Sequence, residues 1–70
     1  MNMNRPSILL VDVFNVCLPI QNIQIIDKIT NDVIAEGKEW ELHKLLNEYG
    51  EHEVYKIKSH RDTLIIIIKP

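Results

Sequence analysis

Five branched apolar residues in a row, Leu64–Ile68, constrain the fold of this chain more than any other feature of its sequence. The side chains of a strand alternate between two faces, so an unbroken apolar run gives the strand no polar side. Both faces of the strand must then be packed against other residues, and a chain of 70 residues has few residues left to do so. The run therefore predicts packing and association, although it carries no chemistry itself.

The composition predicts a single folded domain over residues 1–70. Apolar residues make up 46% of the chain, which has only two glycines and three prolines, and this excludes the disordered class. A net charge of −2 excludes a strongly basic nucleic-acid binder, so we do not expect direct nucleic-acid binding. Cys17 is the only cysteine, which excludes an internal disulfide and favours a reducing compartment.

The apolar segment Ile8–Leu18 lacks the features of a targeting signal or a membrane span. It contains Asp12, has only Arg5 before it, and ends at Pro19 without a cleavage pattern of small residues. It is also far shorter than the roughly 20 residues that a membrane span requires. We therefore expect a soluble cytoplasmic protein without membrane contact, with residues 1–6 flexible.

Two segments are predicted to be helical. Val11–Cys17 favours a short helix that ends before Pro19, although its β-branched residues also suit a strand, so both remain open for residues 7–18. Glu39–Tyr49 is the clearest helix, because four apolar side chains recur on one face at the helical spacing, and Gly50 suits its C-cap. The apolar face consists of Leu42, Leu45, Leu46 and Tyr49.

Two hairpins complete the predicted fold. Asp27 and Asn31 have the chemistry of a tight turn in the first hairpin, and the second hairpin turns around His60-Arg61-Asp62. The order is (α)ββαββ, an α+β fold with one main amphipathic helix packed on a largely antiparallel sheet. The predicted strands are Ile23–Asp27, Asp32–Glu36, Glu53–Ser59 and Thr63–Lys69.

The second hairpin is expected to place lysine and isoleucine on one sheet face. With a loop at residues 61–62, two lysines of one strand lie opposite two isoleucines of the other, and Lys69 completes the rim. The main helix covers the other face, which carries Tyr55 and Ile57. The mixed face needs a shield, which could be the N-terminal segment, a second copy of the chain or a foreign partner. The opposed pairs are Lys58 with Ile65 and Lys56 with Ile67.

A partner-binding surface is predicted from this face together with Trp40. Trp40 lies opposite the apolar face of its helix, and an outward tryptophan is typical of an interface anchor. Alternatively, the helix begins after Trp40 and the ring folds over the core. The lysines also suit protection of a strand edge against unwanted pairing. The predicted contact residues are Trp40, Lys56, Lys58, Ile65, Ile67 and Lys69, and a homodimer is expected because the last strand is apolar on both sides.

The same basic cluster has an alternative use as an anion site. An oligomer could sequester a small anionic ligand or a nucleotide signal between these side chains. The predicted anion-binding residues are Lys56, Lys58, His60 and Arg61.

Catalytic residues, metals and cofactors are not expected, so the chain is not predicted to be an enzyme. Cys17 shares an apolar stripe with Val13 and Phe14, where a thiol behaves as a small hydrophobe. Glu39 and His43 have a spacing that could hold a divalent ion, but such pairs commonly belong to a solvated helix face. No glycine-rich loop that would cradle a phosphate is present.

The segment Asp27–Ile34, DKITNDVI, followed by Tyr49-Gly50 and Glu53-Val54, resembles small uncharacterised proteins of phages and prophages of low-GC Gram-positive bacteria. The likeness extends from about Val11 to Ile68, with Asn31 where glycine is commoner in the turn. It implies a host-takeover or accessory role in the bacterial cytoplasm, such as inhibition of a defence system, of which anti-CRISPR activity is one form.

Three functions follow as hypotheses. The first is a non-catalytic binding protein that occupies a surface of a larger host protein, such as a defence nuclease. The second is the oligomeric module that sequesters an anionic ligand. The third is a structural subunit of a larger assembly.

Overall fold

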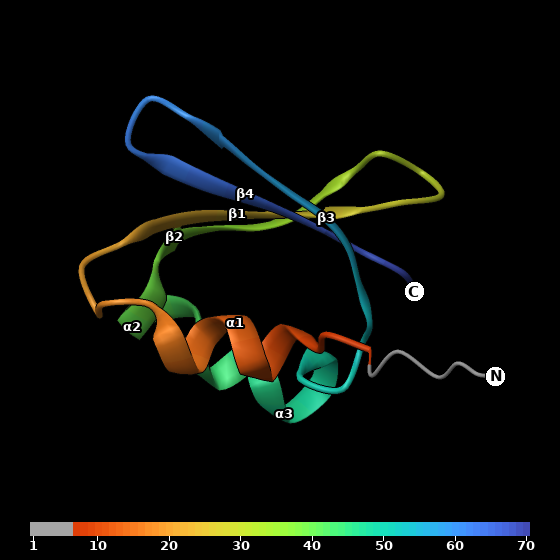
Figure 1. Cartoon of the computed structure of the whole chain (residues 1–70), viewed down its shortest axis with the longest axis horizontal. Helices are drawn as coiled ribbons and strands as arrows, with labels where there is room; N and C mark the ends of the chain where they lie inside the picture. Colours follow the sequence, from red (N-terminus) through yellow and green to blue (C-terminus); the bar gives the residue numbers. More distant parts are fainter. Residues whose placement is uncertain (1–6) are drawn as a thin grey trace, which may run out of the picture.

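The computed structural model describes residues 7–70, which form one four-stranded sheet with a layer of helices on one of its faces (Figure 1). The predicted α+β fold in the order (α)ββαββ is confirmed. The expected flexibility of residues 1–6 concerns a part of the chain outside the described residues. The elements are α1 (Leu10–Val16), β1 (Asn22–Asp27), β2 (Val33–Lys38), α2 (Glu39–Leu42), the 3-10 helix η1 (His43–Leu45), α3 (Leu46–Tyr49), β3 (Val54–His60) and β4 (Thr63–Ile68).

The first element is a helix, which decides between the two structures left open for residues 7–18. Its first backbone N–H groups find acceptors in the segment after α3: Leu10 N–H donates to the His52 carbonyl at 3.0 Å and Val11 N–H to the Gly50 carbonyl at 2.9 Å. These bonds satisfy donors that every helix start leaves unpaired, and they hold α1 beside α3. Helix formation buries Leu10, Val13 and Phe14.

The turn between β1 and β2 forms as its residues predict. Asp27 Oδ1 accepts the backbone N–H groups of Ile29 at 2.7 Å and Thr30 at 3.0 Å, an Asx-type turn. Asn31 follows with a φ of 64°, the left-handed conformation that asparagine tolerates better than most residues.

The main helix is present but is not continuous. Residues 39–49 form α2, η1 and α3 in succession, because Leu42 has a ψ of −4° where an α-helix needs about −42°. Gly50 is the C-cap, as predicted, and its N–H donates to the Leu46 carbonyl at 3.0 Å. The predicted apolar face is confirmed, because Leu42 is buried and Leu45, Leu46 and Tyr49 pack against the core.

The strands lie in the order β2-β1-β4-β3. Both hairpins are antiparallel, whereas the two central strands, β1 and β4, are parallel neighbours. The sheet is therefore largely antiparallel, and Leu64–Ile68 lies inside it with a neighbour on each side. The predicted register of the second hairpin is confirmed, since Lys56 pairs with Ile67 and Lys58 with Ile65.

Tyr55 departs from the predicted pairing. A register shift between Val54 and Lys56 takes it out of the ladder, so it does not simply alternate with its neighbours. Its side chain is half exposed, and Lys28 Nζ lies 4.5 Å from the centre of its ring. This cation–π contact fixes the exposed tyrosine near the end of β1.

The core lies between the sheet and the helices. Its fully buried side chains alternate along the two central strands and meet those of α1. Three shields were possible for the lysine–isoleucine face of the sheet. The N-terminal segment from residue 7 onward is not one of them, because α1 packs on the opposite face, beside α2 and α3 (Figure 1). The buried hydrophobic residues are Leu10, Val13, Phe14, Ile23, Ile25, Leu42, Ile66 and Ile68.

Candidate interaction surfaces

The sheet face that points away from the helices, called here the open sheet face, carries three rows of side chains across the four strands. Each row follows from the pairing of β2 with β1, of β1 with β4 and of β4 with β3. In strand order β2, β1, β4, β3, the first row is Val33, Ile26, Ile67 and Lys56; the second is Glu36, Gln24, Ile65 and Lys58; the third is Lys38, Asn22, Thr63 and His60.

The centre of this face is apolar and only partly shielded. Ile26, Ile65 and Ile67 have intermediate exposure, yet they do not belong to the core or to the side chains packed against it. No helix of residues 7–70 lies over them (Figure 1). The structure thus brings the predicted residues Lys56, Lys58, Ile65 and Ile67 together and adds Ile26 from β1.

Charge is distributed unevenly across the open sheet face. Lys56 and Lys58 lie at its β3 edge, and both are exposed. Glu36 lies at the opposite edge, in the same row as Lys58. The face therefore has a basic β3 edge, an apolar centre, and a β2 edge with one acidic and one basic group, Glu36 and Lys38.

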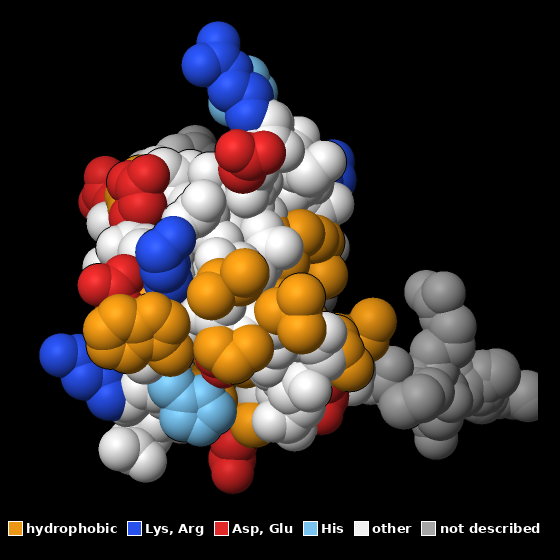
Figure 2. Space-filling model, turned by 90° about the vertical axis from the view of Figure 1, so that its left-hand side faces the viewer, with side chains coloured by type: hydrophobic (Ala, Val, Ile, Leu, Met, Phe, Trp, Pro, Cys, Tyr) orange, Lys and Arg blue, Asp and Glu red, His pale blue; other side chains and the backbone are white. Residues whose placement is uncertain are grey.

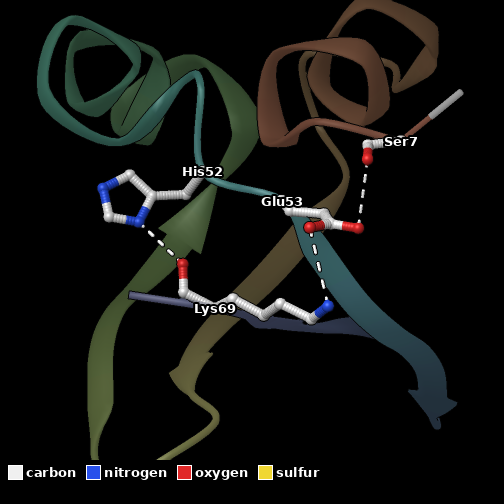
Figure 3. Close-up of polar contacts among 4 residues, drawn as sticks. All are labelled: Ser7, His52, Glu53 and Lys69. Carbon is white, nitrogen blue, oxygen red and sulfur yellow. Dashed lines mark hydrogen bonds and ion pairs between the residues drawn. The ribbon is translucent and has the colours of Figure 1, made fainter.

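Lys69, the sixth predicted contact residue, is tied to the segment before β3 (Figure 3). Its Nζ lies 3.5 Å from Glu53 Oε1, and its carbonyl accepts a hydrogen bond from His52 Nδ1 at 2.8 Å. Ser7 Oγ donates to the other carboxylate oxygen of Glu53 at 3.1 Å. Lys69 therefore joins the two ends of the described chain and is not a free cation beside Lys56 and Lys58.

The four predicted anion-binding residues do not share one pocket. An open hollow of about 490 Å³ lies between the α1–β1 loop and the β3–β4 turn, and among the described residues that line it Arg61 is the single cation. Lys56 and Lys58 lie on the open sheet face, as does His60. This separation weakens the anion-site hypothesis, because the hollow holds Arg61 alone of the four predicted residues.

A second apolar surface, not anticipated from the sequence, surrounds Trp40. We call it the end patch: Val16, Leu18, Pro19, Ile20 and Trp40. Helix α2 begins against the α1–β1 loop, where the backbone N–H of Trp40 donates to the Pro19 carbonyl at 3.1 Å. Figure 2 shows hydrophobic side chains gathered at this end of the molecule, with charged groups around them. Trp40 belongs to this patch, in the helix layer, and not to the open sheet face.

The end patch is strongly exposed. The exposed fraction is 83% for Val16, 70% for Ile20, 69% for Leu18 and 60% for Trp40. Of the two alternatives left open for Trp40, the structure shows the outward one, because α2 begins at Glu39 and Trp40 is exposed. The loop residues were missed because a non-periodic apolar run before a strand gives no indication of which side faces solvent.

The expectation that Glu39 lies on a solvated helix face is wrong. Its side chain is buried, because the α1–β1 loop crosses the start of α2 and the Gln21 carbonyl accepts the Glu39 N–H at 2.9 Å. His43 Nδ1 donates to Glu39 Oε2 at 2.9 Å, which pairs the buried carboxylate. Among residues 7–70, no group of three or more His, Cys, Asp or Glu side chains could hold a metal ion.

Cys17 has the environment of a protonated thiol. It is partly buried and packs against the core. Burial, followed by the negative charge of Glu39, raises the pKa of the Cys17 thiol above its ordinary value. A nucleophilic cysteine needs the opposite shift, since the thiolate is the reactive form.

Comparisons with known proteins identify no family. No protein-family model, no curated protein and no solved structure matches this chain. Within residues 7–70 there is also no helix with the length and apolar character needed to cross a membrane.

Proposed function

We propose that this chain is a small non-catalytic binding protein that acts by occupying a surface of a larger host protein, with Trp40 at the centre of the contact. The observation that carries the proposal is the exposure of the end patch. Four large hydrophobic side chains that expose 60% or more of their surface lie at the end of α1, on the α1–β1 loop and at the start of α2.

Exposing this much apolar surface to water is unfavourable in free energy, and a bound partner would remove that surface from water. The four side chains expose on the order of 500 Å², which is comparable to the largest apolar patch of a typical monomer. Patches of that size often mark binding sites, and tryptophan is among the residues that contribute most to interface energy. The charged groups around the patch in Figure 2 match the polar rim of a protein interface.

A host protein is the partner class that the sequence resemblance favours. The resemblance to phage proteins, as described above, implies a role in host takeover, and a small binding protein suits the blocking of a functional surface. Inhibition of a defence nuclease is the specific form that we propose for this role. The raised pKa of Cys17 is in keeping with a non-catalytic mode of action, because it lowers the fraction of the thiol in its reactive thiolate form.

The experiment compares three forms of the full chain as bait in lysate of a low-GC Gram-positive bacterium: wild type, Trp40→Ala and Ile29→Ala. Ile29 is the matched control, because it is 74% exposed but lies in the β1–β2 turn, outside the end patch. We expect wild type and Ile29→Ala to capture a protein that Trp40→Ala does not. Calorimetry with the purified partner should then show a loss of about 2 kcal/mol or more for Trp40→Ala.

Two results would contradict the proposal. If wild type captures nothing that folded Trp40→Ala does not also capture, the end patch is not a contact surface. If the captured protein is a nuclease whose activity is unchanged at saturating wild-type protein, the inhibitory role is wrong even though the contact is real.

A further inference from the structure

We infer that the open sheet face binds the same face of a second copy of this chain, with the twofold axis parallel to the strands. This interface is separate from the end patch and does not depend on the proposed host contact. The inference starts from the partly exposed isoleucines Ile26, Ile65 and Ile67, over which no element of residues 7–70 lies.

With a twofold axis along the strands, each row of one copy faces the same row of the second copy, with the order of its four residues reversed. Rotation about that axis keeps every row at the same height along the strands and exchanges the two edges of the sheet, so β2 faces β3 of the second copy. In the first row, Ile26 then faces Ile67 of the second copy, and Ile67 faces Ile26. In the second row, Ile65 faces Gln24 of the second copy, so the apolar contact is made by the first row and Gln24 covers Ile65.

The same rotation pairs opposite charges. In the second row, Glu36 at the β2 edge faces Lys58 at the β3 edge of the second copy, and this contact occurs twice because of the symmetry. Packed sheets cross at about 30°, and the long lysine side chain can absorb the resulting offset at the outer strands. The polar third row places Lys38 near His60, two side chains that can both remain hydrated at the rim.

Two other self-associations of the sheet place like charges together. A twofold axis across the strands would set β3 over β3, and pairing of two β3 edges would set them side by side. Each arrangement gathers Lys56 and Lys58 of both copies, and like charges at an interface oppose association. Of these three arrangements, the axis along the strands is the one that opposes Glu36 to Lys58 and also covers the central isoleucines, which is why we place a second copy on this face.

The expected affinity is modest. Four strands of six or seven residues give a face of about 400 Å² in projection, from a strand spacing of about 4.8 Å and a rise of about 3.3 Å per residue. The two faces together make about 800 Å² in projection, which is below the roughly 1,200–2,000 Å² of stable interfaces and in the range of weak, transient ones. The dimer should therefore dissociate on dilution, and the measurement has to cover a wide concentration range.

Sedimentation equilibrium of the full chain tests the inference through a charge exchange. We expect a dimer for wild type, and dimerisation weakened about tenfold or more by Glu36→Lys or by Lys58→Glu. The double variant Glu36→Lys/Lys58→Glu should restore the dimer, because it re-forms the pair with reversed signs. Glu48→Lys and Lys44→Glu are matched controls on the helix layer and should dimerise like wild type. Circular dichroism confirms that each variant is folded.

Three outcomes would overturn the inference. The first is a wild-type monomer at the highest concentration. The second is a double variant that stays monomeric while folded. The third is a dimer that the charge changes leave intact and Trp40→Ala dissociates, which would place the dimer contact at the end patch. A dimer that survives Trp40→Ala while host binding is lost would instead support both interfaces as separate surfaces.

Discussion

His43 Nδ1 donates to Glu39 Oε2 at 2.9 Å across one helical turn, although the His43 side chain is 61% exposed and the Glu39 side chain only 8%. The exposed His43 ring therefore hydrogen-bonds a carboxylate that is buried beneath the α1–β1 loop. Glu39 also acts on Cys17, whose pKa is raised first by burial and then by this negative charge. One acidic residue thus connects the helix start, the loop and the thiol.

Glu39→Gln should lower the pKa of Cys17. The amide keeps the size of the side chain and removes its negative charge, so ionisation of the thiol becomes easier. Burial remains, and the pKa should stay above its ordinary value. The measurement is the pH dependence of the rate of Cys17 alkylation by iodoacetamide. Glu41→Gln is the control on the same helix; a Glu39→Gln profile that coincides with wild type would contradict the assignment.

Arg61→Gly should stabilise the fold by about 0.5–1 kcal/mol. Arg61 has a φ of 58° at the tip of the second hairpin, where a non-glycine residue loses roughly 1–2 kcal/mol. Glycine removes that strain, and its greater freedom in the unfolded chain offsets part of the gain. Asn31→Gly is the matched control, because Asn31 has a φ of 64° but tolerates it better. Urea unfolding of both variants checks this, and an equal or larger gain for Asn31→Gly would refute the explanation.

Local chemistry made much of this fold predictable. The hairpin turns depend on neighbouring residues such as Asp27 and Asn31, and the helical face of residues 39–49 depends on a short repeat, so both could be derived from the sequence. The register of the second hairpin followed from its two-residue loop. These features need no knowledge of distant parts of the chain.

The rest depends on contacts between distant segments. The parallel pairing of β1 with β4 adds Ile26 to the lysine–isoleucine face and sets Glu36 in one row with Lys58. No local pattern encodes that pairing. Burial of Glu39 and the position of Trp40 in the end patch follow from the α1–β1 loop crossing the start of α2, which is also non-local. The turns and the apolar face of the helix were therefore easier to predict than the grouping of side chains into surfaces.

Cys17 should make stability decrease at alkaline pH. A thiol whose pKa is raised in the folded state contributes its full stabilisation below the pKa of the unfolded chain. That contribution is lost as the pH rises through the raised folded value, because the unfolded chain releases the proton first. The difference in unfolding free energy between wild type and Cys17→Ala should therefore shrink across this window. Urea unfolding at a series of alkaline pH values measures it, and a difference independent of pH would contradict the raised pKa.

Gly50→Ala should destabilise the protein by about 1–3 kcal/mol. Gly50 is buried, and a methyl group there would lie 2.5 Å from the Leu46 carbonyl oxygen, a backbone atom that cannot move aside freely. The Gly50 carbonyl also accepts the Val11 N–H at 2.9 Å, so a shift of this residue disturbs the bond that holds α1 in place. Asn47→Ala is the control, since Asn47 is exposed on α3. Thermal and urea unfolding should show a clear loss for Gly50→Ala alone; equal stability of the two variants would mean that the close approach at Gly50 relaxes without cost.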